Sequence, residues 1–227
     1  MIAAAATLAV VASAQASHRD LPTMVLPIPS VPLSVETTEE YVTKNLDGTS
    51  ATEINKTKYY RDATGRMRSE MEMHSAAATL VWVVLDNSID GFAAVLETEA
   101  KIAHRVKFPK PSSPDGWFIG LGPNGLVGVS GKMTRKTEDL GKQSIGGVEC
   151  AGTRTTTASD DQPSLIAVDE LWMSKEFELI GLLKHSGPDG EMTAEIQNVD
   201  RTIPDPALFV IPADYRIRDM EPPGPPQ

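Results

Sequence analysis

The sequence predicts a mainly β protein: a single antiparallel sheet built as a meander, with a short C-terminal helical turn and a long loop. Three observations predict this class. Short β-rich runs are separated by glycine-containing turns, apolar and polar residues alternate within those runs, and the central part of the chain has no long helical pattern.

The N-terminal residues predict export. Residues 2–14 are almost wholly small and apolar, and Ala14-Gln15-Ala16 follows as an A-x-A cleavage pattern. The apolar run is shorter than the roughly 20 residues that a membrane-spanning helix needs. We therefore expect residues 1–16 to be a removed signal peptide and the mature protein to be periplasmic or secreted, not embedded in the membrane.

Proline content marks the limits of the folded part. Four prolines between residues 17 and 33 disfavour a helix and predict an extended leader. Residues 220–227 have the same character and predict a disordered, proline-rich tail. A single β domain is therefore expected over residues 34–219.

Charge and cysteine content limit the partners. The formal net charge is -10, and lysine and arginine are scattered along the chain, so nucleic acid is not an expected partner. Cys150 is the only cysteine, which leaves no intramolecular disulfide. A small buried residue in a strand is the expected role of Cys150.

Five turn segments predict hairpins between successive strands. Glycine in each segment supplies the positive φ that tight hairpin turns need, and connections this short join antiparallel neighbours. The segments are Asp47-Gly48, residues 62–65, Asp90-Gly91, Gly146-Gly147 and residues 188–190.

Patterns within the runs predict which strands are buried. Residues 66–74 alternate methionine and serine with charged residues, as a half-buried strand does, whereas residues 81–85 are apolar on both faces and predict a central strand covered on both sides. Asp205 and Pro206 predict the start of a helical turn at residues 204–209. Residues 107–131 predict a long loop or lid.

Three short motifs could indicate nucleotide binding, catalysis or zinc binding, but their sequence context or spacing does not fit those sites. Residues 120–125 match G-x-G-x-x-G, but Pro123-Asn124-Gly125 is a turn and no helix pattern follows. Ser130 lacks the spacing of a nucleophile elbow, and the four histidines show no zinc-site spacing. We expect no catalytic residue, no metal site and no cofactor, and therefore not an enzyme.

Methionine and tryptophan side chains are the candidate ligand-contacting residues. Thioether side chains adapt to irregular or flexible ligands, and a curved sheet that does not close can leave its interior partly empty. The alternative is plain core packing. The candidate lining of an apolar cavity comprises Met67, Met71, Met73, Trp82, Trp172 and Met192.

Three stretches resemble a family of uncharacterised exported bacterial proteins. They are residues 59–70, residues 140–157 and residues 199–215. That family is more distantly similar to the periplasmic lipoprotein-carrier and outer-membrane lipoprotein-sorting superfamily. The resemblance implies that the single antiparallel sheet is strongly curved and unclosed, a half-barrel. It also implies a helix or loops that plug the concave face, and a hydrophobic cavity for acyl chains.

Two functions follow as hypotheses. In the first, an exported envelope protein binds a lipid, a lipidated molecule or another hydrophobic ligand on the concave face of the sheet. In the second, it is a structural or sensory periplasmic module with a filled core that binds an envelope protein partner along a sheet edge or the long loop. A connected apolar pocket favours the first, and a filled interior favours the second.

Overall fold

The structure is a computed structural model that describes residues 24–25, 30–44, 47–74, 79–107, 133–159, 166–188 and 190–221. All of these residues belong to one compact unit, formed by Met24–Trp117 and Val129–Gln227. The second unit, Met1–Thr23 with Phe118–Gly128, lies outside the described residues, as do the predicted signal peptide, most of the predicted loop and residues 222–227 of the tail.

Twelve strands form one sheet, which confirms the predicted mainly β class. The strands are β1 (Leu33–Lys44), β2 (Ser50–Arg61), β3 (Met67–His74), β4 (Thr79–Asn87), β5 (Phe92–Glu97), β6 (Ile102–Lys107), β7 (Met133–Ile145), β8 (Val148–Ser159), β9 (Ile166–Ser174), β10 (Leu179–Gly187), β11 (Gly190–Asp200) and β12 (Arg216–Met220). Within the described ranges, two short 3-10 helices, η1 (Ser88–Asp90) and η3 (Pro206–Phe209), accompany them.

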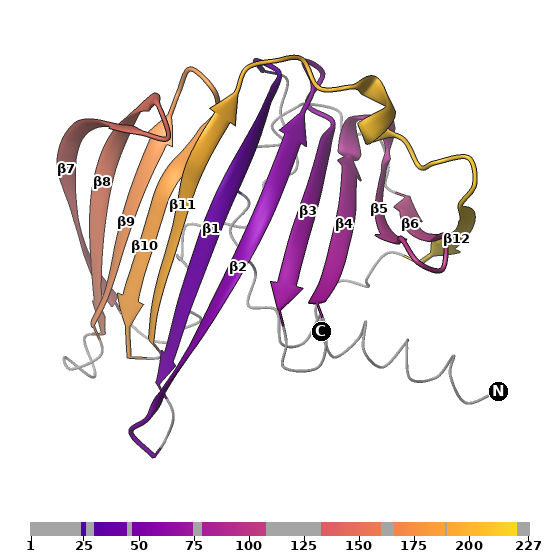
Figure 1. The fold of residues 1–227 in the computed structure, drawn as a ribbon. Helices are drawn as coiled ribbons and strands as arrows, with labels where there is room; N and C mark the ends of the chain where they lie inside the picture. Colours follow the sequence, from indigo (N-terminus) through magenta and orange to yellow (C-terminus); the bar gives the residue numbers. More distant parts are fainter. Residues whose placement is uncertain are drawn as a thin grey trace. The chain divides into compact units, whose positions relative to one another are not determined.

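The strand order shows two meanders rather than one. Strands β1 to β6 follow one another across one half of the sheet, and β7 to β11 follow one another across the other half. The halves join where β1 pairs with β11, so residues 33–44 lie at the centre of the sheet (Figure 1). The expected single meander therefore needs this correction.

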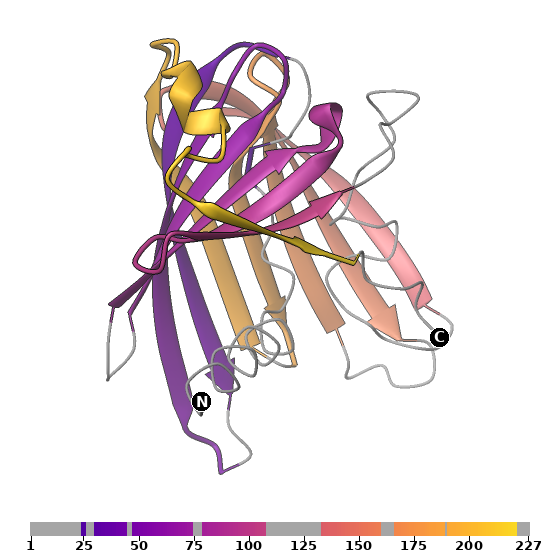
Figure 2. The same ribbon diagram turned by 90° about the vertical axis from the view of Figure 1, so that its right-hand side faces the viewer.

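The sheet is curved and unclosed, as expected. Its edge strands, β12 and β7, do not pair with each other. Figure 2 shows the strands bending around a concave side, so the sheet has a concave face and a convex face. Strand β12 pairs in parallel with β6, an exception to the expected antiparallel pattern, because a long C-terminal connection carries the chain back to that edge.

The described turns confirm the predicted hairpins. Gly48, Gly65, Gly91 and the Gly146-Gly147 pair have positive φ and lie between the expected strands. Strand β7 begins at Met133, and its residues 134–139 are all polar, so they give no period-2 signal in the sequence. It is an edge strand, so few of its side chains need to be apolar.

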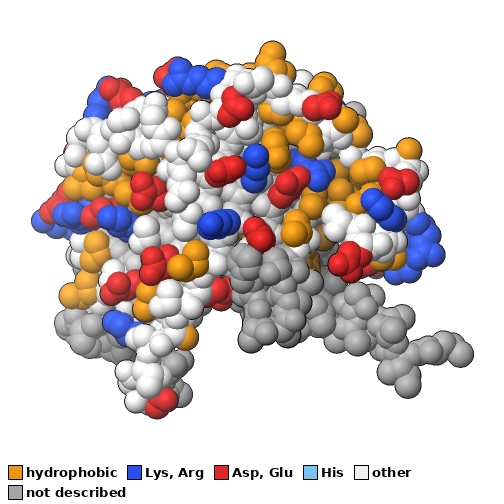
Figure 3. Space-filling view, viewed as in Figure 1, with side chains coloured by type: hydrophobic (Ala, Val, Ile, Leu, Met, Phe, Trp, Pro, Cys, Tyr) orange, Lys and Arg blue, Asp and Glu red, His pale blue; other side chains and the backbone are white. Residues whose placement is uncertain are grey.

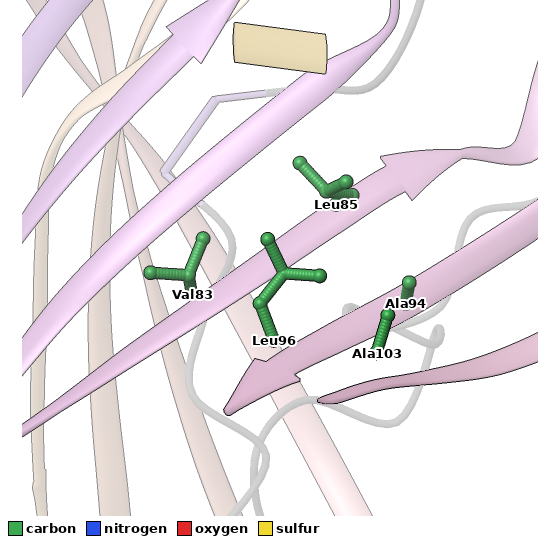
Figure 4. Packing of buried hydrophobic residues seen from close by; sticks show 5 residues of the cluster. All are labelled: Val83, Leu85, Ala94, Leu96 and Ala103. Atoms are coloured by element: carbon green, nitrogen blue, oxygen red, sulfur yellow. The ribbon is translucent and has the colours of Figure 1, made fainter. Parts of the chain in front are cut away.

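The C-terminal segment covers the convex face of β3 to β6. Val83, Leu85, Ala94, Leu96 and Ala103 form a buried cluster there, drawn in Figure 4, and Ile211 and Tyr215 pack against it. The Asn87 side chain donates to the Phe209 carbonyl at 2.6 Å. Asp205 caps η3 by accepting from the Ala207 amide at 2.9 Å, as the sequence predicted.

The rest of the viewed face carries mixed charge. Figure 3 shows acidic and basic side chains spread over the face that Figure 1 presents, rather than gathered in one place. Ion pairs such as Lys58–Glu36 and Arg154–Glu170 join neighbouring strands of the sheet.

Several residues of the predicted leader are part of the folded unit, among them Leu33, which begins β1, and the earlier residues Met24 and Val25. Met24 and Val25 are fully buried, Val25 bridges Leu179, and the Met24 carbonyl accepts from the Ile180 amide at 2.7 Å. The backbone of Met24 also hydrogen-bonds to the hydroxyl of Tyr59. These two residues therefore lie on the concave face, against β2 and β10.

Arg61 ties three chain segments together at the end of β2. Its side chain is fully buried and donates to the carbonyls of Val31, Phe177 and Glu178, at distances of 2.5–3.1 Å. Burial lowers the pKa of Arg61, because removing the charged guanidinium from water costs free energy. Hydrogen bonds to three carbonyl dipoles offset part of this desolvation cost. Arg61 thereby joins the start of β1 to the turn between β9 and β10.

Candidate ligand-binding face

The strand register defines which side chains share the concave face. Directly paired residues of neighbouring strands point to the same side of a sheet. Three rows across the sheet follow from the pairing. The first is Trp82, Met71, Thr57, Thr37 and Ile196; the second is Asn55, Glu39, Ala194, Leu183 and Leu171; the third is Glu53, Tyr41, Met192, His185 and Asp169.

An apolar area occupies the concave face of β3, β4 and β5. It consists of Met71, Trp82, Val84 and Val95, which the register places together and which are all only half-buried. On the convex side of the same strands, the C-terminal segment packs over Val83 and Leu85, which are buried, whereas Val81 is 52% exposed. The expected covering of residues 81–85 is thus present over Val83 and Leu85 only, and Trp82 and Val84 keep part of their surface open on the concave side.

Most of the predicted lining residues share this face. Met67, Met71, Trp82 and Met192 all lie on it, Met67 and Met192 being buried. Met73 belongs to β3, but its side chain lies outside what the structure describes. Trp172 lies on the convex face instead. It pairs with Leu182, and the same row of paired residues continues across the next strands. That row comprises Glu195, Thr38 and Lys56.

Trp172 packs flat over Gly152 of the neighbouring strand. A Cβ atom at residue 152 would lie 2.5 Å from Trp172 Cε3. The Gly152→Ala variant is therefore expected to lose about 1–3 kcal/mol of unfolding free energy, because the indole must move out of a packed position. Urea unfolding followed by tryptophan fluorescence measures this. Thr153→Ala, at an exposed position, serves as the control, and equal stability of the two variants would contradict the packing argument.

A buried polar group adjoins the apolar area. Glu39 is fully buried, and Thr37, Thr57 and Asn55 beside it are 2–3% exposed. The hydroxyls of Thr37 and Thr57 reach Glu39 Oε1 at 3.5 Å, which is long for a hydrogen bond. Thr37 also donates to the Thr57 carbonyl at 3.3 Å, so its single proton is shared. The carboxylate therefore receives only weak hydrogen bonds from its protein neighbours.

Burial controls the protonation of Glu39. Removal of the carboxylate from water raises the pKa of Glu39 to about 7, and the two threonine hydroxyls lower it only in part. Tyr59, on the same face, has its pKa raised by burial and by the charge of Glu39. Glu39 is thus a carboxyl that changes charge near neutral pH inside the sheet.

Two acceptor atoms of this group lack donors. Among the described residues no donor reaches Glu39 Oε2 or Asn55 Oδ1, although both atoms are buried. The Asn55 amide nitrogen donates to Glu53 Oε1 at 3.3 Å, which fixes the amide with its oxygen as the unused end. Glu39 and Asn55 are direct partners across β1 and β2.

Sequence reasoning missed Glu39 and Asn55. The alternation of β1 would have identified Glu39. Every second residue from Leu33 onward points to the buried face, and Glu39 follows Val35 and Thr37 in that series. Asn55 has the parity of the buried Thr57 and Tyr59 in β2. A carboxyl in an otherwise apolar register position is uncommon and marks a site to examine.

A histidine–aspartate pair lies one row further along the concave face. His185 Nδ1 is 2.7 Å from Asp169 Oδ1, and His185 is 8% exposed. A second pair joins His104 to Glu97 at 2.6 Å. Over the described parts of the chain, no group of three or more His, Cys, Asp or Glu side chains could hold a metal ion. No described helix is long and apolar enough to cross a bilayer.

Comparisons with known proteins give structural matches only. No protein-family model and no curated protein sequence matches the chain. MucB of Pseudomonas aeruginosa, solved in complex with MucA, matches with 11% identity and a TM-score of 0.44 over 85% of this chain and 60% of that chain. The protein described here thus spans less than two thirds of the MucB chain.

Two further matches are of the kind that the sequence resemblance led us to expect. One is described as an outer membrane lipoprotein-sorting protein domain from Vibrio parahaemolyticus, with 8% identity and a TM-score of 0.35 over 81% of this chain and 91% of that chain. The other is a LolA superfamily protein from Nitrosomonas europaea, with 7% identity and the same TM-score and coverage. At these identities the likeness concerns the fold alone.

Proposed function

We propose that this protein is exported to the cell envelope and binds an amphiphilic molecule with an acyl chain on the concave face of its sheet. The observation that carries the proposal is the half-buried apolar area of Met71, Trp82, Val84 and Val95. On the other side of β4 and β5, Val83, Leu85, Ala94 and Leu96 are already buried in the core cluster. Apolar side chains left open on a concave face are typical of a ligand site.

The neighbouring polar group suits an amphiphile better than a purely apolar ligand. Thr57 pairs with Met71 on one side and with Thr37 on the other, so the apolar area continues directly into the buried polar residues around Glu39. A few placed polar groups beside an apolar lining orient a ligand. The chain of the ligand would contact β3 to β5, and its polar end would reach β1 and β2.

A protein-binding module is the second candidate, and strand β7 favours it. β7 spans Met133–Ile145 at one edge of the sheet, and no described strand pairs with its outer side. Such an edge can accept a strand from a partner. Lys136 and Glu138, however, place charged side chains along this edge, which is how proteins discourage strand addition. We therefore favour the ligand-binding role, as a binding protein and not an enzyme.

Native mass spectrometry of protein purified from its own envelope fraction tests the proposal. The expected result is a mass adduct that organic extraction removes and that fragments as a lipid. A second measurement uses N-phenylnaphthylamine, a neutral probe that fluoresces in apolar sites. A protein that carries no adduct and does not raise the fluorescence of this probe would rule out the proposed function.

Met71→Gln is expected to weaken binding of the fluorescent probe by about tenfold or more, because a buried amide without a hydrogen-bond partner costs about 1–3 kcal/mol. The matched control is Glu72→Gln, which introduces the same side chain one residue along, at an exposed position of the convex face. The dissociation constant is measured by fluorescence titration. Equal effects of the two substitutions would place the probe elsewhere.

A further inference from the structure

The unused acceptor atoms of Glu39 and Asn55 identify the chemistry of the ligand's polar end. Residues that pair directly across antiparallel strands have Cβ atoms about 4.5–5.5 Å apart, so these two side chains are neighbours on the concave face. Glu39 is fully buried and Asn55 is 3% exposed. A buried acceptor without a donor costs free energy, and folded proteins keep very few of them.

When Glu39 is ionised, the existing protein donors do not satisfy this pair. The two threonine hydroxyls both approach Glu39 Oε1, and neither approaches Oε2. The amide nitrogen of Asn55 is directed to Glu53 instead. Strand β11, on the other side of β1, contributes Ile196, Ala194 and Met192 to this face, and none of these side chains carries a donor.

We infer that the polar end of the ligand is a hydrogen-bond donor, an ammonium group or a pair of neighbouring hydroxyl groups, that binds between Glu39 Oε2 and Asn55 Oδ1. This inference rests on the proposed function and names the head group that the site selects. An ammonium group, or two neighbouring hydroxyl groups, supplies one donor to each of the two adjacent acceptors and so satisfies both atoms. An ammonium would also neutralise the buried carboxylate.

The same arrangement selects against an anionic head group. A phosphate or a carboxylate brings further acceptor oxygens and negative charge to a position that already has two acceptors, with Glu53 next to Asn55. Along β1 and β2 the cation on this face is Arg61, and its donors are directed to three backbone carbonyls at the end of the strand. Like charges in a site of low polarity repel strongly.

Three probes with the same hexadecyl-length chain test the head group: hexadecylamine, hexadecyl glycerol ether and palmitate. Each is titrated below its micelle concentration against the full chain loaded with N-phenylnaphthylamine. We expect the amine and the glycerol ether to displace the fluorophore at concentrations about tenfold or more below that of palmitate. Palmitate displacing it as readily as the other two would overturn the inference.

Glu39→Gln and Glu40→Gln form the matched pair of variants. Glu40 is the next residue of β1, is exposed, and lies on the convex face. We expect Glu39→Gln to weaken binding of hexadecylamine by about tenfold or more while palmitate binds no worse, since only the buried carboxylate has been removed. Glu40→Gln should change neither. An unchanged ratio of amine to palmitate affinity in Glu39→Gln would overturn the inference.

The remaining outcomes are also decisive. The ranking of the three probes in the unmodified protein needs no variant, so a misfolded Glu39→Gln would leave the head-group inference testable. Asn55→Ala, which removes the second acceptor, should weaken the glycerol ether. If none of the three probes displaces the fluorophore and the fluorophore itself does not bind, the proposed function fails. If they bind without discrimination, only the head-group inference fails.

Discussion

Arg61→Met is expected to lower the free energy of unfolding by about 3–5 kcal/mol, one of the largest effects expected in this protein. The guanidinium is fully buried and donates to three carbonyls from two other parts of the chain. Methionine fills much of the same volume and donates nothing, so the carbonyls of Val31, Phe177 and Glu178 lose a buried donor. Urea unfolding followed by circular dichroism measures the change.

Arg154→Met is the control for this experiment. Arg154 is 40% exposed and pairs with Glu170 across β8 and β9, on the surface of the sheet. Because an exposed ion pair contributes about 1 kcal/mol or less, its loss should be small. A loss in Arg61→Met no larger than that in Arg154→Met would show that Arg61 does not join the start of β1 to the turn between β9 and β10.

Glu39→Gln is expected to stabilise the protein at alkaline pH by about 3 kcal/mol and to leave its stability unchanged in acid. Burial raises the folded-state pKa of Glu39 from 4.5 to about 7. Between these two values the unfolded chain releases the proton and the folded chain retains it, so the folded state binds more protons. The stability of the unmodified protein therefore falls as pH rises through this window.

Glutamine has no proton to lose, so the variant lacks this decline. The titratable groups that face Glu39 from β1 and β2 are Tyr41, Tyr59 and Glu53, and β11 contributes none. Free energies of unfolding measured from about pH 4 to about pH 8 should show the two proteins converging in acid and diverging above neutrality. Parallel curves for the two proteins would mean that Glu39 is hydrated in the folded state.

A donor ligand would change this pH dependence in a specific direction. An ammonium beside Glu39 favours the carboxylate and so lowers its pKa in the complex. Binding of hexadecylamine should then remove part of the loss of stability at alkaline pH. The thermal midpoint with and without hexadecylamine, compared for the unmodified protein and Glu39→Gln, reports this coupling.

The class of the fold and most hairpins were determined by local features of the sequence. Glycine at the turns and alternation in residues 66–74 act over a few neighbouring residues, and the structure has hairpins where these features predict them. The capped turn at Asp205 is equally local. Strands β6 and β12 and the first part of β7 were not predicted, because their residues alternate weakly and their pairing comes from the sheet around them.

The candidate site depended on contacts that are distant in sequence. The pairing of β1 with β11 makes residues 33–44 the central strand, and this pairing decides that Glu39 is enclosed between Asn55 and Ala194. Trp172 is a second example. Strand periodicity predicted that its side chain is buried, but only the register of β9 against β10 decided that it packs over Gly152 on the convex face.

The sequence alone therefore determined that the chain forms an antiparallel sheet of short hairpins, since turn chemistry and side-chain alternation are encoded within a few residues. Only the tertiary structure decided which face is concave and which polar groups it buries. The physical reason is that a one-residue change in register moves every side chain of a strand to the opposite face, and register between distant strands is set by the packing of the whole sheet.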